Sequence, residues 1–290
     1  MNQGEAYLLG MIIGNGEIQK GDSLTNVTID IPFKNLYTDD LKDVAIYLKA
    51  SLIDIKTIVE PIICCSLTVV EFSHSIKLSF RKANSDPIIK DIEKYIGGGF
   101  HHSTMRMNSD LFSLTTDERK SFLRGIADVT AYIRKSNIAF GAEHEHRVYI
   151  EVPGNFGLVV DIANMLKTID IPVQTLDFGH PNFRDSNLKK YNEGKKGYWK
   201  KEHQLKVYAN EFLPVGFNVK HKQEALEKYA AELLSAISST KTHKYYWEKS
   251  ARDKVKPHHP GENDPYLPAS IRGKHFDSWQ DLAKVLGYGK

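Results

Sequence analysis

The sequence lacks the features that indicate a disulfide-stabilised or a membrane protein. Only two of its 290 residues are cysteines, Cys64 and Cys65, and a bridge between chain neighbours would be strained. No run of about 18 uninterrupted apolar residues occurs, and the amino terminus has no basic segment followed by an apolar stretch. We therefore expect reduced cysteines, no membrane partner and a cytoplasmic location, associated with the nucleoid in a prokaryotic cell.

A large excess of charge of one sign is also missing. The chain has 39 Lys and Arg against 36 Asp and Glu, a formal net charge of +3, so its total charge does not indicate a polyanionic partner. One segment, from Leu188 to Gln204, gathers lysines with Tyr and Trp between them, a composition that suits contact with phosphates. A solvated loop is the alternative interpretation. The lysines are Lys189, Lys190, Lys195, Lys196, Lys200 and Lys201.

Two segments share one helical pattern and indicate an internal repeat. Glu5 to Ile18 and Ser121 to Ile133 are apolar on almost all sides, which is typical of a buried helix. We expect the two helices to cross in close contact, because small residues allow backbones to approach. The small residues at the predicted crossing are Gly10, Gly14 and Gly125.

Each of these helices is followed by the same predicted order of elements: two strands, a helix, two strands and a helix. In the first copy we predict strands at 17–19 and 26–33, a helix at 39–52, strands at 62–71 and 75–81, and a helix at 87–96. In the second copy we predict strands at 131–140 and 147–152, a helix at 156–169, strands at 173–178 and 204–208, and a helix at 222–237. A capping box at Ser278 predicts one more helix at 279–286.

These elements predict an α+β chain made of two pseudo-symmetric αββαββα units with a C-terminal extension. We place the N-terminal half at 1–98, a linker at 99–115, the C-terminal half at 116–240 and the extension at 241–290. The extension is rich in His, Pro and Lys, and its histidines have no compact metal-ligand spacing. No metal site is predicted there.

Aligned by their glycines, the segments LLGMIIGNG (Leu8 to Gly16) and LRGIADVTA (Leu123 to Ala131) resemble the two motif helices of single-chain LAGLIDADG homing endonucleases. The resemblance covers roughly residues 4 to 240. It implies a monomeric saddle that binds double-stranded DNA. In the family each motif helix ends on an acid, and the two carboxylates hold divalent metal for phosphodiester hydrolysis.

The sequence departs from the family pattern at the acid positions, which are Asn15 and Thr130. Both side chains are neutral, whereas a hard cation such as Mg²⁺ usually needs one or two carboxylates from the protein. Glu17 and Asp128 are the nearby acids that would have to replace them. We therefore expect Mg²⁺ as a cofactor only if the chain is catalytically active.

Polar residues alternate with apolar ones along the predicted strands, as expected for a sheet with one buried face. The resemblance implies that the polar face enters the major groove, where Arg suits guanine and Asn or Gln suits adenine. The candidate DNA-reading residues are Asn26, Thr28, Asp30, Tyr132, Arg134, Ser136, Arg147, Tyr149, Glu151, Gln204, Lys206 and Tyr208.

The leading hypothesis is a sequence-specific DNA-binding protein with lost or impaired cleavage. It would then be the recognition component of a restriction or defence system and act with a nuclease or other partner subunit. The first alternative is an active magnesium-dependent endonuclease, of the homing or restriction type, that uses Glu17, Asp128 or the C-terminal extension. The second is an RNA-binding splicing cofactor.

Overall fold

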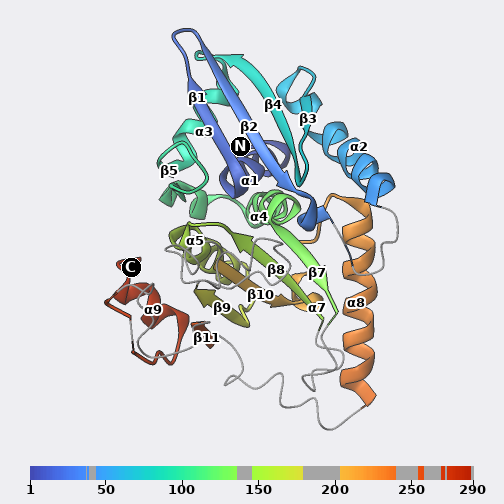
Figure 1. The fold of residues 1–290 in the computed structure, drawn as a ribbon, viewed down its shortest axis with the longest axis vertical. Helices are drawn as coiled ribbons and strands as arrows, with labels where there is room; N and C mark the ends of the chain where they lie inside the picture. The colour runs from blue at the N-terminus through green and yellow to red at the C-terminus, as the bar shows by residue number, and fades with distance from the viewer. Residues whose placement is uncertain are drawn as a thin grey trace.

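Two crossing helices, α1 (Gln3–Asn15) and α4 (Thr116–Thr130), form the centre of the structure (Figure 1). This computed structural model describes the backbone of residues 1–36, 38, 44–135, 146–178, 203–239, 254–257, 269–271 and 273–288. A capping box satisfies free N–H groups at the start of both helices. It joins Asn2 with Glu5 in α1 and Thr115 with Glu118 in α4.

The crossing depends on glycines at matching places in both helices. A Cβ atom on Gly10 would overlap the carbonyl oxygen of Phe122, and one on Gly125 would overlap that of Tyr7. Each glycine therefore packs against the backbone of the other helix. Gly14 lies one turn further on, where a Cβ atom would lie 2.9 Å from a methyl group of Val129. All three small residues predicted at the crossing therefore lie at the contact between the two helices.

The first sheet continues directly from α1. It has the order β1-β2-β4-β3, with every neighbouring pair antiparallel. Its inner face is apolar and packs against the helices, with Val27, Ile29 and Leu78 almost fully buried. The strands are β1 (Gly16–Lys20), β2 (Leu24–Pro32), β3 (Thr68–Glu71) and β4 (Ser75–Ala83).

The second sheet continues from α4 in the same way. Its order is β7-β8-β10-β9, which repeats the order of the first sheet, and β11 adds a parallel strand beside β9. This matched order confirms the predicted α+β repeat. The strands are β7 (Ala131–Arg134), β8 (Arg147–Val152), β9 (Thr175–Phe178), β10 (His203–Tyr208) and β11 (Lys254–Pro257).

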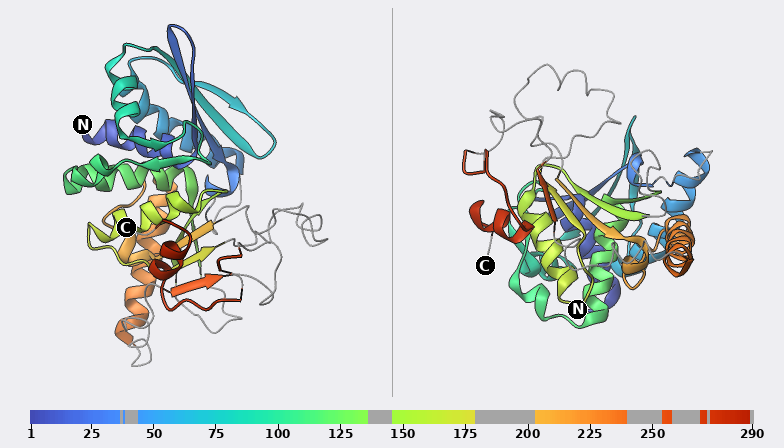
Figure 2. Two further views of the ribbon diagram at one scale, coloured as in Figure 1. Left: turned by 90° about the vertical axis from the view of Figure 1, so that its left-hand side faces the viewer. Right: turned by 90° about the horizontal axis from the view of Figure 1, so that it is seen from below.

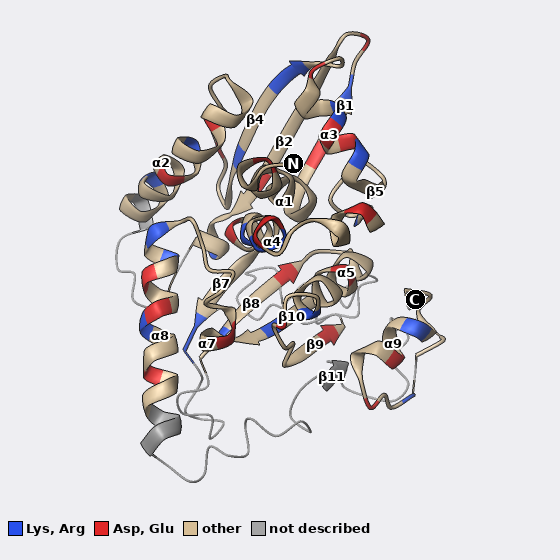
Figure 3. Cartoon of the chain, turned by 180° about the vertical axis from the view of Figure 1, so that it is seen from behind, with Lys and Arg blue, Asp and Glu red and all other residues tan. Residues whose placement is uncertain are grey.

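The other helices pack around this centre. Figure 2 shows the central helices on one side of the molecule and the strands of both sheets on the other. The long helix α8 carries interspersed acidic and basic residues along its length (Figure 3). The helices are α2 (Val44–Ile63), α3 (Pro87–Tyr95), α5 (Phe156–Lys167), α7 (Ala209–Phe212) and α8 (Lys220–Ser239), with single 3-10 turns η1 (Phe33–Leu36) and η2 (Ser109–Ser113).

The helix α2 differs from the prediction, because it continues to Ile63 and replaces the first part of the strand expected at 62–71. The apolar, β-branched residues near Ile62 favoured a strand. Ile55, Val59 and Ile63 are instead spaced four residues apart and are all fully buried, so helical burial decides the outcome. The helix stops at Cys64, whose φ of 47° lies in the left-handed region.

The segment between the halves and the chain's end both carry structure. The hairpin of β5 (Ile96–Gly98) and β6 (Met105–Met107) lies within or beside the predicted linker. The final helix, α9 (Trp279–Val285), starts at the predicted cap, where the Ser278 hydroxyl accepts from the Asp281 N–H. Among the residues that the structure describes, no helix is long and apolar enough to cross a membrane.

Candidate nucleic-acid interface

The two motif positions that are acids in the resembled family are buried and already hydrogen-bonded. The Asn15 side chain is 7% exposed, and its amide donates to the carbonyl oxygen of Asp30 at 2.6 Å. Thr130 is 1% exposed, and its hydroxyl donates to the carbonyl oxygen of Ile126 at 2.7 Å. Neither group brings negative charge to the end of its helix.

Asp128, one of the two possible replacement acids, is fully buried inside the second half. Its carboxylate accepts from the Tyr7 hydroxyl at 2.8 Å and from the backbone N–H groups of Asn218 and Val219 at 3.0 and 3.4 Å. Burial raises the pKa of Asp128, while nearby Lys222 and these hydrogen bonds oppose the shift. The residue therefore ties α1, α4 and the start of α8 together.

A buried lysine completes this region. The Lys222 ammonium donates to the carbonyl oxygens of Ala127, Asp128 and Ala131 at 2.9, 3.2 and 2.8 Å. These carbonyls lie where α4 ends and β7 begins, so the cation lies at the negative end of the helix dipole. The Ala127 carbonyl oxygen also accepts from the Ala131 N–H. Burial lowers the pKa of Lys222 to about 7.

Glu17, the other replacement acid, is half-exposed on β1 beside Thr28 of β2. Gln19 donates to its carboxylate at 2.9 Å. A divalent cation needs several oxygen or nitrogen ligands around one point, and the described residues contain no cluster of three His, Cys, Asp or Glu that fits a metal ion. Asn15, Thr130 and Asp128 are occupied in hydrogen bonds, so this donor set does not fit the family's metal site.

The outer side of the first sheet carries an open polar surface, which we name the first polar face. Antiparallel register arranges it in three rows across the strands, and every member is exposed or half-exposed. The rows are Gln19–Asn26–Arg81, then Glu17–Thr28–Ser79–Thr68, then Asp30–Lys77–Val70. The predicted residues Asn26, Thr28 and Asp30 are therefore brought together on one face.

Sequence reasoning missed the part of this face that comes from β4. Lys77, Ser79 and Arg81 alternate with the buried Ile76, Leu78 and Phe80. The same alternation marked β2, so it would have identified β4 as well. Arg81 is exposed and is the strongest hydrogen-bond donor of the first polar face.

The equivalent surface of the second sheet, the second polar face, follows from the matching register. Its rows are Arg134–Arg147–Tyr208, then Tyr132–Tyr149–Lys206–Thr175, then Glu151–Gln204–Asp177. The predicted residues Tyr132, Arg134, Arg147, Tyr149, Glu151, Gln204, Lys206 and Tyr208 do share one face.

One row of this second polar face is closed, whereas Tyr132, Arg134, Arg147, Tyr149 and Lys206 in the other two rows are half-exposed, as the alternation predicted. Glu151 is 4% exposed and Gln204 is 1% exposed. The Glu151 carboxylate accepts from Lys34 at 2.7 Å, from Gln204 at 2.7 Å and from the Tyr132 hydroxyl at 3.0 Å. Within this row Gln204 therefore donates to Glu151, while the Gln204 Oε1 atom is buried without a hydrogen-bond partner.

The neighbouring rows are partly occupied as well. Lys206 forms an ion pair with the fully buried Asp177 at 2.6 Å. The rings of Tyr132 and Tyr149 stack with centroids 5.1 Å apart, and Tyr208 is buried. Ser136 and the predicted lysines of the basic segment, from Lys189 to Lys201, lie outside the described residues.

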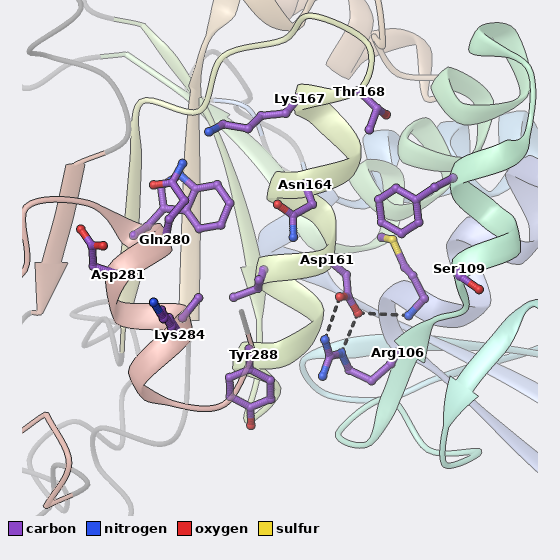
Figure 4. Close-up of a pocket in the computed structure, with 15 residues that line it drawn as sticks. Arg106, Ser109, Asp161, Asn164, Lys167, Thr168, Gln280, Asp281, Lys284 and Tyr288 are labelled. Carbon is purple, nitrogen blue, oxygen red and sulfur yellow. Dashed lines mark hydrogen bonds and ion pairs between the residues drawn. The ribbon is translucent and has the colours of Figure 1, made fainter. Parts of the chain in front are cut away.

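A separate cavity of about 740 Å³ lies between α5, β6 and the final helix α9 (Figure 4). Arg106 forms a bidentate ion pair with Asp161 on its wall, at 2.6 and 2.7 Å. That hydrogen bonding raises the pKa of Arg106. Trp279 is 1% exposed, so the C-terminal helix is anchored beside the cavity.

No family model matches the sequence, and no curated protein matches it. Solved structures similar to this chain include mesophilic variants of the homing endonuclease I-DmoI, at 15% identity and TM-score 0.37, over 76% of this chain and 95% of that one. I-DmoI with DNA and Mn is 14% identical at TM-score 0.36, over 76% and 96%. The LAGLIDADG homing endonuclease I-LtrWI, bound to target DNA, is 11% identical at TM-score 0.38, over 83% and 92%.

The helix crossing and the strand order of this chain show the resemblance without the TM-scores. Two glycine-centred helices cross reciprocally, and each runs directly into a sheet with the same strand order. In its fold the chain resembles the single-chain LAGLIDADG homing endonucleases.

Proposed function

We propose that this chain binds double-stranded DNA in a sequence-specific way and does not cut it by the metal mechanism of the resembled family. The observation that carries the proposal is the first polar face, where three rows of mostly hydrogen-bonding side chains lie exposed or half-exposed on an antiparallel sheet. A β-ribbon of this kind fits a major groove about 12 Å wide. Because both motif helices belong to one chain, a monomer contains both halves of the fold.

The side chains of the first polar face are of the types that read base edges. Arg81 can donate two hydrogen bonds to guanine, and Asn26 or Gln19 can pair with the edge of adenine. Exposed Val70 offers an apolar contact for a thymine methyl group. These groups come from β1, β2, β3 and β4, so a rigid sheet holds them at fixed spacing.

Impaired cleavage follows from the ends of the motif helices. Asn15 and Thr130 are neutral, buried and hydrogen-bonded to the backbone, and Asp128 is enclosed by its three donors. A recogniser of this kind would serve as the specificity component of a restriction or defence system, with the cutting group on another subunit.

Binding is tested by fluorescence anisotropy with duplexes recovered from a random library. We expect Arg81→Ala to weaken binding to the recovered site at least tenfold, because a bidentate base contact is lost. Lys56→Ala removes the same charge from α2, where Lys56 pairs with Glu60, and should change affinity less than twofold. Equal effects of both variants would contradict base reading by the first polar face.

Cleavage is tested by incubating the protein with supercoiled plasmid that carries the recovered site, in Mg²⁺ and separately in chelator. We expect no magnesium-dependent nicking above a buffer control. Nicking that Glu17→Gln removes would instead establish the active endonuclease. Tighter binding to structured RNA than to duplex DNA would establish the RNA-binding alternative, because an A-form helix hides its major groove.

A further inference from the structure

The segment between the two halves adds a further edge to the first sheet. Two backbone hydrogen bonds, each 2.8 Å long, tie residues 100–102 to β1 on the side away from β2. Between these bonds, His101 lies opposite Glu17 in an antiparallel bridge. Residues opposite each other in an antiparallel pair direct their side chains to the same face. His101 therefore extends the Glu17 row of the first polar face by one strand, a contribution that was not predicted for the linker at 99–115.

The imidazole of His101 is exposed, and one of its two nitrogens is already engaged. The Ser103 N–H donates to Nδ1 at 3.3 Å, and the Ser103 hydroxyl lies 2.7 Å from the same atom. Because a backbone N–H can only donate, Nδ1 is the acceptor, and the neutral ring carries its proton on Nε2. Among the residues that the structure describes, none accepts from Nε2. This N–H is therefore free to donate to a ligand.

The ring is held in place by its surroundings. It packs against the ring of His102 with centroids 4.0 Å apart. The carbonyl oxygen of His101 accepts from the N–H groups of Thr104 and Met105 at 2.8 and 2.9 Å, which closes a turn. The carbonyl oxygen of His102 accepts from the amide of Asn155, in the second half, at 2.7 Å. A donor that is already fixed loses little conformational entropy when it binds.

The position of His101 across the sheet decides which part of DNA it faces. Neighbouring strands lie about 4.8 Å apart, so residues 100–102 lie three spacings, about 14 Å, from β4, the strand of Arg81. A major groove is only about 12 Å wide. With Arg81 in the groove and the strands following it, His101 lies at the edge of the groove, which sugar and phosphate form. Glu17 lies one strand further in, where a carboxylate can accept from the amine of cytosine.

From this placement, and resting on the proposed function, we infer that His101 donates a hydrogen bond from Nε2 to a backbone phosphate of the bound duplex. A phosphate oxygen accepts hydrogen bonds, and the free ring nitrogen donates one. The segment between the halves thus belongs to the DNA-binding surface. Phosphate contacts fix register and orientation but carry no sequence information, so His101 adds affinity for every duplex and leaves the choice of bases to the sheet.

The first test measures affinity by fluorescence anisotropy for the recovered duplex and for a scrambled one. We expect His101→Ala to weaken both about tenfold, as for the loss of one hydrogen bond to a charged acceptor. His101→Gln, whose amide nitrogen can take the place of Nε2, should weaken binding less than His101→Asn, whose shorter amide takes the place of Nδ1. A loss confined to the recovered duplex would assign His101 to a base edge and overturn the inference.

His275→Ala is the matched control for this test. That histidine side chain is 91% exposed in the segment before α9, outside the first sheet, and its loss should change affinity less than twofold. The thermal midpoint of each variant checks that it is folded. An equal effect of His275→Ala and His101→Ala would contradict a specific contact at His101.

The second test locates the phosphate. Copies of the recovered duplex, each with one neutral methylphosphonate linkage, are bound to the parent and to His101→Ala. We expect one linkage that weakens the parent about tenfold and the variant less than twofold, because both changes remove the same contact. If every linkage weakens both proteins equally, the inference falls and sequence-specific binding stands. Failure to recover any enriched duplex would overturn the proposed function and the inference with it.

Discussion

Gly125 faces the carbonyl oxygen of Tyr7 so closely that a Cβ atom on the glycine would overlap it, and Gly10 stands in the same relation to Phe122. The contact joins backbone to backbone, so no side chain can rotate away to make room. The whole arrangement of two sheets depends on this crossing, because each motif helix leads without a loop into the first strand of its sheet.

We expect Gly125→Ala to destabilise the chain by about 3 kcal/mol, at the upper end of overpacking effects, because the helices must move apart. The free energy of unfolding from urea titration measures it. Gly97→Ala is the control, since a Cβ atom there would have its nearest neighbours at 3.4 Å. Equal stability of the two variants would mean that the crossing is looser than described.

Lys222→Met should destabilise the chain by about 3 kcal/mol. The substitution removes the donor that the carbonyl oxygens of Ala127, Asp128 and Ala131 share, and it removes the cation beside the buried Asp128. Lys220→Met is the control, because the Lys220 side chain is 81% exposed and its loss should change stability by less than about 0.5 kcal/mol. Thermal and urea unfolding compare the two.

Stability should fall as the pH is lowered from about 6.5 towards about 3, partly through His203. Burial lowers the pKa of His203 from 6.5 to about 3. Across that window the unfolded chain binds a proton that the folded chain does not, so acid favours unfolding, by up to about 1.4 kcal/mol per pH unit.

The variant His203→Phe isolates this contribution, because the ring packs near Phe156 and Phe178. Carboxylates also titrate in this range, so the difference in unfolding free energy between variant and parent is measured at several pH values. We expect the variant to gain stability relative to the parent as the pH falls. A pH-independent difference would show that His203 is not held neutral.

Trp279→Ala should release the C-terminal helix from the body of the chain. The side chain is 1% exposed, and Lys167 of α5 lies over its ring at 5.1 Å. The loss of a buried Trp costs about 3 to 5 kcal/mol of local stability. Limited trypsin digestion should cut after Lys284 sooner than in the parent, while Val285→Ala, at a 42% exposed position, should leave the rate unchanged.

Much of the architecture was accessible from residue patterns alone. The glycine-centred helices, the strand alternation and the cap at Ser278 are local signals, and each depends on spacing within one segment. The end of α2 was mispredicted because β-branched residues near Ile62 suit either a strand or a buried helix. Only the packing of Ile55, Val59 and Ile63 into the core distinguishes the two.

The sequence by itself determined that two copies of one helix-and-sheet unit exist and that the acid positions at their motif helices are Asn15 and Thr130. It also placed the polar residues of both halves on one side of each sheet. Whether such a face is open was decided only by tertiary structure. Lys34 lies 117 positions before Glu151, and no local pattern reveals a pair that forms because the chain brings one half against the other.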